Sequence, residues 1–532
     1  MFSLLHDWCT RSSLYWLTLR KSMQHQMREL HQDSWPSVTI NTRSISAGLY
    51  HAGETTLTIA EMLQCLANPR QDAATVAIHT FDFLRDLHAI GDNNSRRLAR
   101  KCISHWIEHN SMWRKKPWRG SGWHLDVLGY RLCNWFGFYD FFGHSADQEF
   151  RKKLLNSIGQ QYRFLKRSYT RIKDPLSRFR ALKGLIYAGC ALPREQNKLG
   201  KWLANLQVCL SEQFDEKFNH QSRHPETLVL LLRDLIDLRL LLRHFYAGHI
   251  DVINEYIVQL APIVRHLRHS DGGLSSFTGN VTSRLEAFCG SSVSDRLVDM
   301  ALSLADSRAI IAEPVAMGYV RCSSKSGFLL INTQPTLTYT RLNDWYSKST
   351  GALDFEWSEK STRLITRADV SIFPHNLNTF VNYQLAKDYD NKNHVIHEKG
   401  VGFFDGGYKE IVCANRIDTS GTVLKNRREL YISENGDIRG EDYFFSSQMG
   451  TGYLRFLAAP GLEWRVTGEN EVAFLCKGGL NTQKPEHIKR FLCNEHIQMN
   501  VFDVLEQKAL CLTFQIPANN EISLRWAIAP VT

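Results

Sequence analysis

The chain has 532 residues, of which 43% are hydrophobic and 22% are charged. This length exceeds that of one ordinary core and predicts two or three domains, and the aromatic content of 13 Trp, 18 Tyr and 28 Phe excludes a disordered chain. The formal net charge of +10 favours an anionic partner, which could be a uronic-acid polysaccharide, nucleic acid or anionic lipid.

The first 58 residues form an N-terminal extension before any sustained helical pattern. Met1–Trp8 is apolar only briefly, and it lacks the basic region and the small-residue cleavage site of a signal peptide. We therefore expect no signal peptide. Twelve cysteines are scattered through the chain without a CxxC pair. This pattern is typical of buried free thiols and indicates a reducing compartment.

From about Ile59 to Leu304 the apolar residues recur at helical spacing. Leu228–Leu242 is the most apolar stretch, but charged residues interrupt it, so we expect a buried helix and no transmembrane segment. Eight or so helices joined by short loops pack as antiparallel pairs, which predicts an α/α toroid over residues 59–310. The helical stripes are Thr80–Leu87, Arg97–His109, Leu128–Phe142, Phe150–Tyr169, Leu176–Cys190, Leu199–Phe214, Pro225–Phe245 and Val252–Leu267.

Near Glu313–Pro314 the hydrophobic period changes from that of helices to that of strands. Turn signals separate the strands and no long helical pattern intervenes, so we predict an antiparallel β-sandwich over residues 311–532. The strand candidates are Gly318–Cys322, Gly327–Asn332, Leu430–Ser433, Tyr453–Phe456, Ala473–Cys476 and Ile522–Ala527.

Several segments, in collinear order from about Phe81 to the C-terminus, resemble one known family. They are Phe81–His88, Trp123–Trp135, Leu182–Gly189, Arg223–Thr227, His269–Asn280, Leu430–Asp442 and Leu524–Ala527. The family is that of the heparinase II/III-like polysaccharide lyases, within the chondroitin AC lyase and alginate lyase superfamily, and the similarity is greatest to its proteobacterial branch. The resemblance implies an incomplete α/α toroid followed by a β-sandwich, and β-elimination on an acidic polysaccharide without a cofactor.

Elimination requires a cation or amide to neutralise the uronate carboxylate, a Tyr or His to remove the C5 proton, and an acid to protonate the leaving oxygen. The family carries a His at the start of a sandwich strand, where Lys348–Ser358 of this chain places Ser349. On the ring, Asp174–Ser177 replaces the Asn-His pair that the resemblance predicts. Serine is no base near neutral pH without an activating partner, and the zinc-binding His of some relatives is not transferable, so no metal site is expected.

The catalytic candidates are Arg223, His224 and Tyr130. Arg223 and His224 precede Pro225, a residue favoured at the first position of a helix. Arg223 could clamp a carboxylate and His224 could act as a base; alternatively, Arg223 pairs with a helix-end acid and His224 caps the helix.

A second group of candidates lies close to Tyr130 in the sequence, and its members are the proposed substrate-binding residues. Stacking on a sugar ring combined with contact to a carboxylate is one interpretation, and a helix core with a buried polar anchor is the other. The candidates are Trp123, Arg131, Asn134 and Trp135.

The sequence thus leaves two main hypotheses: a β-eliminating lyase of acidic polysaccharide, and a catalytically degenerate polysaccharide-binding or scaffold protein on the same fold. Nucleic-acid binding ranks below both, because no recognised binding module is present. His394 and His397 are spaced i, i+3 without a third ligand, which argues against a metal site. The resemblance implies the periplasm or cell envelope, whereas the free cysteines and the missing leader indicate the cytoplasm. The sequence makes no prediction of the oligomeric state.

Overall fold

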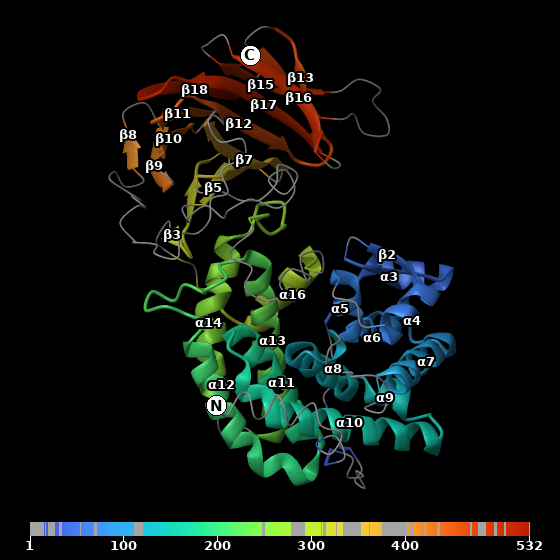
Figure 1. Ribbon diagram of the computed structural model, residues 1–532. Helices are drawn as coiled ribbons and strands as arrows, with labels where there is room; N and C mark the ends of the chain where they lie inside the picture. Colours follow the sequence, from blue (N-terminus) through green and yellow to red (C-terminus); the bar gives the residue numbers. More distant parts are fainter. Residues whose placement is uncertain are drawn as a thin grey trace. The chain divides into compact units, whose positions relative to one another are not determined.

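The structure is a computed structural model of the whole chain (Figure 1). The residues that it describes are Tyr15, Thr18, Leu19 and the ranges 27–30, 35–53, 55–68, 72–110, 121–246, 250–277, 293–309, 311, 315–325, 327–332, 353–360, 362–374, 402–404, 408–419, 422–433, 437–468, 471–476, 486–493, 497–504 and 507–530.

Contacts divide the chain into two compact units. The first consists of Met1–Ser222, Glu226–Ala261 and Val281–Ala309, and the second of Arg223–Pro225, Pro262–Asn280 and Ile310–Thr532. The second unit therefore takes two short segments from the helical half of the sequence. The expected domain ranges 1–58, 59–310 and 311–532 stay predictions, because contact-based units do not establish which parts fold independently.

The first unit opens with a short helix and a hairpin. Helix α3 (Thr39–Ser44) precedes β1 (Leu49–Ala52), which pairs antiparallel with β2 (Thr55–Thr58). Thr58 then caps α4 (Ile59–Ala67): its hydroxyl accepts a hydrogen bond from the Glu61 amide, and the Glu61 carboxylate accepts one from the Thr58 amide. This reciprocal capping box satisfies two backbone donors and fixes where the helix begins.

The rest of the first unit is helical, in agreement with the predicted stripes. Asp92, Asp147 and Asp174 each cap a helix by accepting a hydrogen bond from an amide in its first turn. Among the described residues, no helix has the length and apolarity needed to cross a membrane. The helices are α5 (Ala73–His79), α6 (Leu84–Ile90), α7 (Asn93–His109), α8 (Leu125–Gly137), α9 (Tyr139–Gly143), α10 (Gln148–Ser168), α11 (Pro175–Ala191), α12 (Leu199–Ser211), α13 (Pro225–Phe245), α14 (Ile250–His266) and α16 (Asp295–Ala305).

Some predicted helical stripes are only partly helical: Leu128–Phe142 is divided at Phe138 into α8 and α9, and α12 ends at Ser211, before the predicted Phe214. Within Thr80–Leu87, residues 80–83 form a turn, and α6 begins at Leu84. Phe81 has a φ of 63°, which ends the right-handed path of α5 and is uncommon for a bulky residue. Its ring is fully buried against Phe83 and Trp135, so packing holds the backbone in this conformation.

The second unit contains two antiparallel sheets, as the two-residue period predicted. The first has the order β16-β17-β12-β7-β6-β5-β4-β3 and the second the order β13-β14-β15-β18-β11-β10-β9-β8. Their strands are β3 (Val315–Ala316), β4 (Tyr319–Ser323), β5 (Gly327–Asn332), β6 (Phe355–Glu359), β7 (Thr362–Pro374), β8 (Gly402–Phe404), β9 (Tyr408–Thr419), β10 (Thr422–Ser433), β11 (Ile438–Ser446), β12 (Gly450–Ala458), β13 (Leu462–Val466), β14 (Glu471–Cys476), β15 (Glu486–Cys493), β16 (Gln498–Val504), β17 (Gln507–Ile516) and β18 (Asn520–Pro530).

Aromatic side chains join the two sheets into one core. Trp526 on β18 packs edge-on against Phe456 on β12, with ring centroids 4.8 Å apart, and stacks on Phe355 of β6 at 5.8 Å. In each pair, one ring comes from one sheet and the other ring from the second sheet, as in a face-packed sandwich. Arg428 and Asp442 form a buried ion pair at 2.6 Å, and the Trp526 indole donates a hydrogen bond to the Asp442 carboxylate at 2.9 Å.

The cysteines agree with the expectation of buried thiols. Among the described ones, Cys65 is half-buried, seven others are buried, and all are free. The redox compartment inferred from them stays a prediction.

Candidate functional site

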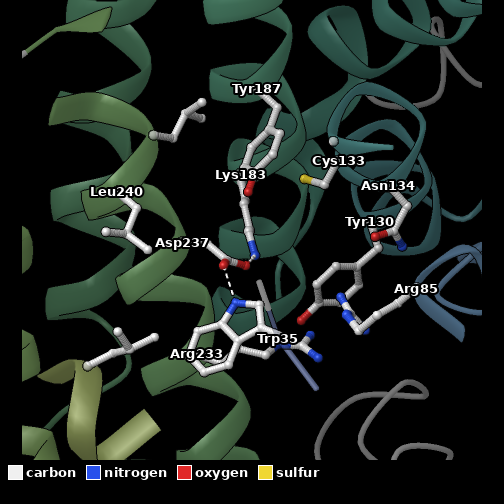
Figure 2. Close-up of a pocket in the computed structure, with 13 residues that line it drawn as sticks. Trp35, Arg85, Tyr130, Cys133, Asn134, Lys183, Tyr187, Arg233, Asp237 and Leu240 are labelled. Atoms are coloured by element: carbon white, nitrogen blue, oxygen red, sulfur yellow. Dashed lines mark hydrogen bonds and ion pairs between the residues drawn. The ribbon is translucent and has the colours of Figure 1, made fainter. Parts of the chain in front are cut away.

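A pocket in the helical unit gathers side chains from several helices. α8 supplies Tyr130, Cys133 and Asn134, and α11 supplies Lys183 and Tyr187. Each helix contributes residues spaced i, i+3 or i, i+4, which places them on one face. The remaining lining residues are Trp35, Arg85, Gly137, Arg233, Asp237, Leu240, Leu241 and Leu304, and Figure 2 shows most of these side chains turned toward a common space.

Two glycines allow α8 and α11 to approach closely behind the pocket. A Cβ atom at Gly129 would lie 2.4 Å from the carbonyl oxygen of Arg180, and one at Gly184 would lie 2.7 Å from the Cα of Gly129. Contacts this short are possible only without side chains. The sequences Gly129-Tyr130 and Lys183-Gly184 therefore position one pocket residue from each helix beside the crossing point.

Buried charges on α11 and α13 are paired across the pocket. The Lys183 ammonium lies 2.7 Å from Oδ1 of Asp234 and 2.6 Å from Oδ2 of Asp237, and Lys183 and Asp234 are almost completely buried. The Tyr130 hydroxyl donates to Oδ2 of Asp234 at 2.5 Å. The Trp35 indole donates to Asp237, as the dashed line in Figure 2 marks. Buried ions need such partners because solvent cannot stabilise their charge.

The network sets the protonation states of its members. Burial and the neighbouring Asp234 carboxylate both raise the pKa of Tyr130, so the phenol keeps its proton at neutral pH. Burial opposes charge on Lys183, but Asp234 and Asp237 outweigh it and raise the pKa of the ammonium. Burial would raise the pKa of Asp234, yet Lys183 and Arg233 lower it overall, so this carboxylate is ionised.

Arg233 brings a further cation to the pocket. Its Nη2 lies 3.5 Å from Oδ1 of Asp234, while its Nε is buried and, among the described residues, has no hydrogen-bond partner. Arg85 also lines the pocket and forms a 2.7 Å ion pair with Asp82. An unpaired buried N–H costs free energy, and an oxygen of a bound anion would remove that cost.

The pocket is small. Its volume is about 40 Å³, room for roughly three water molecules. A single carboxylate fits this space, whereas a whole sugar ring does not. The arrangement therefore suits the recognition of one anionic group that projects from a larger ligand.

Among the predicted site residues, Tyr130 and Asn134 line the pocket, as expected for neighbours on one face of α8. The Asn134 amide donates to the carbonyl oxygen of Thr80 at 2.9 Å and so anchors α8 to the turn before α6. Of the two interpretations offered for this group, the structure shows a buried polar anchor at Asn134, and its role toward substrate stays a prediction.

The other predicted substrate-binding residues are buried in a core beside the pocket. Trp135 is fully buried and Trp123 is 5% exposed, and both pack against Trp106. Arg131 is also fully buried: its guanidinium lies 4.1 Å from the centroid of the Trp106 ring, and its Nε donates to Gln161 at 2.7 Å. Their substrate-binding roles stay predictions, and the structure documents packing at these positions.

The three predicted catalytic residues are divided between the units. Arg223 and His224 belong to the second unit, whereas Tyr130 belongs to the first. Arg223 has a φ of 53°, and its carbonyl oxygen accepts a hydrogen bond from the Tyr319 hydroxyl at 2.9 Å. Pro225 is the first residue of α13, as predicted. The clamp and base roles of Arg223 and His224 stay predictions.

The second unit has a buried polar cluster of its own, built from His269–Asn280, which carried the family resemblance, and from Lys348–Ser358, where Ser349 departs from the family. His269 Nε2 lies 2.5 Å from Oε2 of Glu356, and its Nδ1 lies 2.5 Å from Oγ of Ser358. Ser276 donates to Oε1 of Glu356 from both its amide and its hydroxyl. His269 and Glu356 are buried, so the cluster ties the loop after α14 to strand β6.

Sequence reasoning missed Lys183, Arg233, Asp234 and Asp237 as site residues. Arg233, Asp234 and Asp237 are among the charges that interrupt the apolar stretch Leu228–Leu242. That interruption was the available signal, since buried charges are retained where they are paired or functional. Asp174, which replaces the family's Asn-His pair, is an N-cap that accepts from the Ser177 amide at 2.7 Å.

Glu226, in the first turn of α13, was also missed. Burial raises the pKa of its carboxyl group to about 8, and its Oε2 has no hydrogen-bond partner among the described residues. A carboxyl group with such a pKa can exchange protons near neutral pH. A single Glu near a helix start gives no sequence signal of this kind, because it is the ordinary residue there.

Several expectations concern residues outside the described ranges. They are Ser349 at the family's His position and the histidine pair His394 and His397.

Solved structures of heparinases are similar in fold to this chain. A heparinase III gene product matches with a TM-score of 0.55 and 14% identity over 95% of this chain and 87% of its own. A crystal structure of heparinase III matches with a TM-score of 0.58 and 12% identity over 87% and 78%. The chain has a heparinase III-like fold. A heparan sulfate lyase from Pedobacter heparinus also matches, at a TM-score of 0.45 and 11% identity over 93% and 84%.

The heparinase III-like fold confirms the predicted architecture, an incomplete α/α toroid followed by an antiparallel β-sandwich. No family model and no curated protein matches the sequence. At these identities the likeness concerns the fold alone.

Proposed function

We propose that this chain is a polysaccharide lyase-like protein that acts on a uronic-acid-containing polysaccharide by β-elimination, with the pocket around Arg233 as the subsite for a carboxylate. The single observation that carries the proposal is Arg233, which lines a pocket of carboxylate size and whose buried Nε has no hydrogen-bond partner among the described residues. A carboxylate oxygen would complete its hydrogen bonding. The heparinase III-like fold supports the same class of substrate.

The chemistry follows from the charges around the pocket. A uronate carboxylate beside Arg233 and Arg85 would be neutralised, and this makes its C5–H bond more acidic. Removal of that proton by a base forms the C4–C5 double bond and breaks the bond between C4 and the glycosidic oxygen. The leaving oxygen then needs a proton.

Tyr130 is our proton donor for the leaving oxygen. Its phenol is neutral because burial and Asp234 raise its pKa, so it is suited to be an acid and not a base. The ionised Asp234 orients the hydroxyl at 2.5 Å, and Lys183 keeps that carboxylate in place at 2.7 Å. In this proposal Tyr130 would contact the leaving oxygen, while Asp234 and Lys183 act as positioning residues.

The net charge of +10 adds a longer-range contribution. A polyanionic chain is attracted to a basic surface before any specific contact forms, and this attraction weakens as salt is added. We therefore expect binding of the polymer to decrease with ionic strength, whereas turnover of bound substrate depends on the pocket.

The test is the ultraviolet absorbance of the unsaturated uronate that elimination creates. Purified full-length chain is incubated with heparan sulfate, alginate, hyaluronan and chondroitin, each at low and moderate salt. Absorbance should rise with at least one polymer, and Arg233→Met should lower kcat/KM by about 10²-fold, the scale of losing one charge-stabilising donor. Arg97→Met on the exposed face of α7 is the matched control and should leave kcat/KM unchanged.

The second candidate is a polysaccharide-binding protein on the same fold that has lost catalysis. Two observations favour it: Ser349 stands where the family resemblance expects a His, and the Tyr130 hydroxyl is committed to Asp234. It predicts retention of the chain on an immobilised uronate polymer, weakened by Arg233→Met, with no rise in absorbance for any of the four polymers. No retention and no absorbance would reject both candidates.

A further inference from the structure

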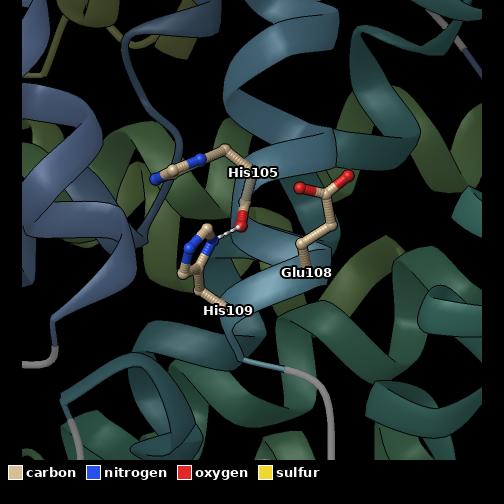
Figure 3. Close-up of side chains that lie close together, drawn as sticks. All are labelled: His105, Glu108 and His109. Atoms are coloured by element: carbon tan, nitrogen blue, oxygen red, sulfur yellow. Dashed lines mark hydrogen bonds between the residues drawn. The ribbon is translucent and has the colours of Figure 1, made fainter.

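The last turn of α7 carries a cluster of potential metal ligands that does not line the pocket described above. His105, Glu108 and His109 are spaced i, i+3 and i+4, so all three project from the same end of one helix (Figure 3). One ligand atom from each, a ring nitrogen or a carboxylate oxygen, lies within 4.8 Å of the other two. The imidazole centroids of His105 and His109 are 4.0 Å apart.

Both histidines have one side of the ring held by a backbone group. Nδ1 of His109 lies 2.8 Å from the carbonyl oxygen of His105, as Figure 3 shows, so Nε2 is the nitrogen of this ring that could bind a metal ion. The His105 ring is hydrogen-bonded to the backbone of Leu63 on α4. Metal-binding histidines commonly use their second nitrogen in this way, because the hydrogen bond to a carbonyl fixes the tautomer and the ring orientation.

The position on the helix favours a cation. His109 is the last residue of α7, where unpaired carbonyl groups give the helix end a partial negative charge. The Glu108 carboxylate adds a full negative charge within reach of both imidazoles. A pair of histidines one turn apart on a helix is also the spacing with which known zinc sites present two ligands to one ion.

We propose that His105, Glu108 and His109 bind one divalent transition-metal ion, with zinc as the physiological candidate. Two imidazoles and one carboxylate match the ligand preference of zinc, whereas calcium and magnesium prefer oxygen ligands alone. Three protein ligands leave one position of a tetrahedral ion for water. This site does not depend on the proposed lyase function. No metal site was expected from the sequence, so the proposal departs from that expectation.

The experiment measures zinc binding to the full chain after removal of metal with EDTA. Isothermal titration should give one equivalent of zinc, and cobalt should bind with a visible absorption band typical of nitrogen and oxygen ligands. His105→Ala and His109→Ala should each weaken binding by more than about 10-fold, since loss of even an outer-shell partner costs 10- to 100-fold. Glu108→Gln should weaken it as well and should alter the cobalt band.

His144→Ala is the matched control, because this histidine is exposed, with a side-chain exposure of 71%, and lies outside the cluster. It should bind zinc and cobalt as the unmodified chain does. Circular dichroism of the metal-free proteins shows which variants fold, and Glu108→Gln, an exposed position, decides the outcome if a histidine variant does not. Absence of stoichiometric binding overturns the proposal, and so does binding that survives unchanged in the folded variants of the cluster.

Discussion

The hydroxyl of Tyr130 on α8 lies 2.5 Å from Oδ2 of Asp234 on α13, although 104 residues separate the two in sequence. This hydrogen bond joins the two helices across the pocket and keeps the phenol protonated. A Tyr in this environment carries its proton at neutral pH, and in the proposed elimination it would stand on the leaving-group side.

Replacing Tyr130 by Phe tests this assignment. The change removes the hydroxyl and keeps the ring, so kcat for the proposed elimination should fall by about 10²-fold or more, the usual contribution of a positioned acid. Tyr162→Phe is the control, because Tyr162 also donates to a carboxylate, that of Glu195, but does not line the pocket. Equal loss of turnover in both variants, followed by ultraviolet absorbance, would show a general structural effect.

Lys183 forms buried ion pairs with the carboxylates of Asp234 and Asp237. Lys183→Met keeps the volume of the side chain but leaves Asp234 and Asp237 without their cation, so the free energy of unfolding should fall by about 3–5 kcal/mol. The Lys153–Glu149 pair on α10 has a similar distance of 2.7 Å but is exposed. Lys153→Met should therefore change stability by less than about 0.5 kcal/mol. Urea denaturation of both variants measures the difference, and equal effects would contradict the buried network.

Glu226 should make stability depend on pH. Its pKa is raised by burial from 4.5 to about 8, so between these values the folded chain holds a proton that the unfolded chain releases. The contribution of this group is therefore full below pH 4.5 and is lost as the pH rises to 8. Glu226→Gln should be as stable as the unmodified chain near pH 4.5 and more stable at pH 8, as measured by thermal unfolding across this range.

The control for this prediction is Glu149→Gln, an exposed residue on α10. Its difference from the unmodified chain should vary little with pH. A pH-independent difference for Glu226→Gln would show that the carboxyl group does not titrate in this range.

The crossing of α8 and α11 should be intolerant of a single methyl group. A Cβ at Gly129 would lie 2.4 Å from a backbone oxygen, which cannot move without shifting the helix, so Gly129→Ala should destabilise by about 1–3 kcal/mol. Gly137 ends the same helix, and a Cβ there meets no atom within 4 Å. Gly137→Ala should be neutral or stabilise by up to about 1 kcal/mol. Calorimetry of both variants decides whether the close approach exists.

Much of the architecture could be predicted from the sequence because it depends on local patterns. The stripe Leu176–Cys190 corresponds to α11 at Pro175–Ala191, and the Asp174 cap lies just before it, since capping and periodicity act within a few residues. The turn at Phe81 could not be predicted. Its apolar spacing is compatible with a helix, and only packing against Trp135 favours the positive φ.

The candidate site shows the same division. Tyr130 and Asn134 could be selected because helical spacing places them on one face. Their charged neighbours Lys183 and Arg233 could not, because the sequence does not indicate which buried charges meet across two helices. Nor does it indicate that an imidazole pair at the end of α7 has both rings oriented by backbone carbonyls.

By itself, the sequence determined the order of a helical half and a sheet half, since hydrophobic period and capping are properties of neighbouring residues. Tertiary structure alone decided that Lys183 lies between Asp234 and Asp237, and that Arg233 lines a pocket. Such contacts depend on how closely helices approach one another in space: the Lys183 ion pairs join α11 to α13, and the missing side chains at Gly129 and Gly184 let α8 approach α11.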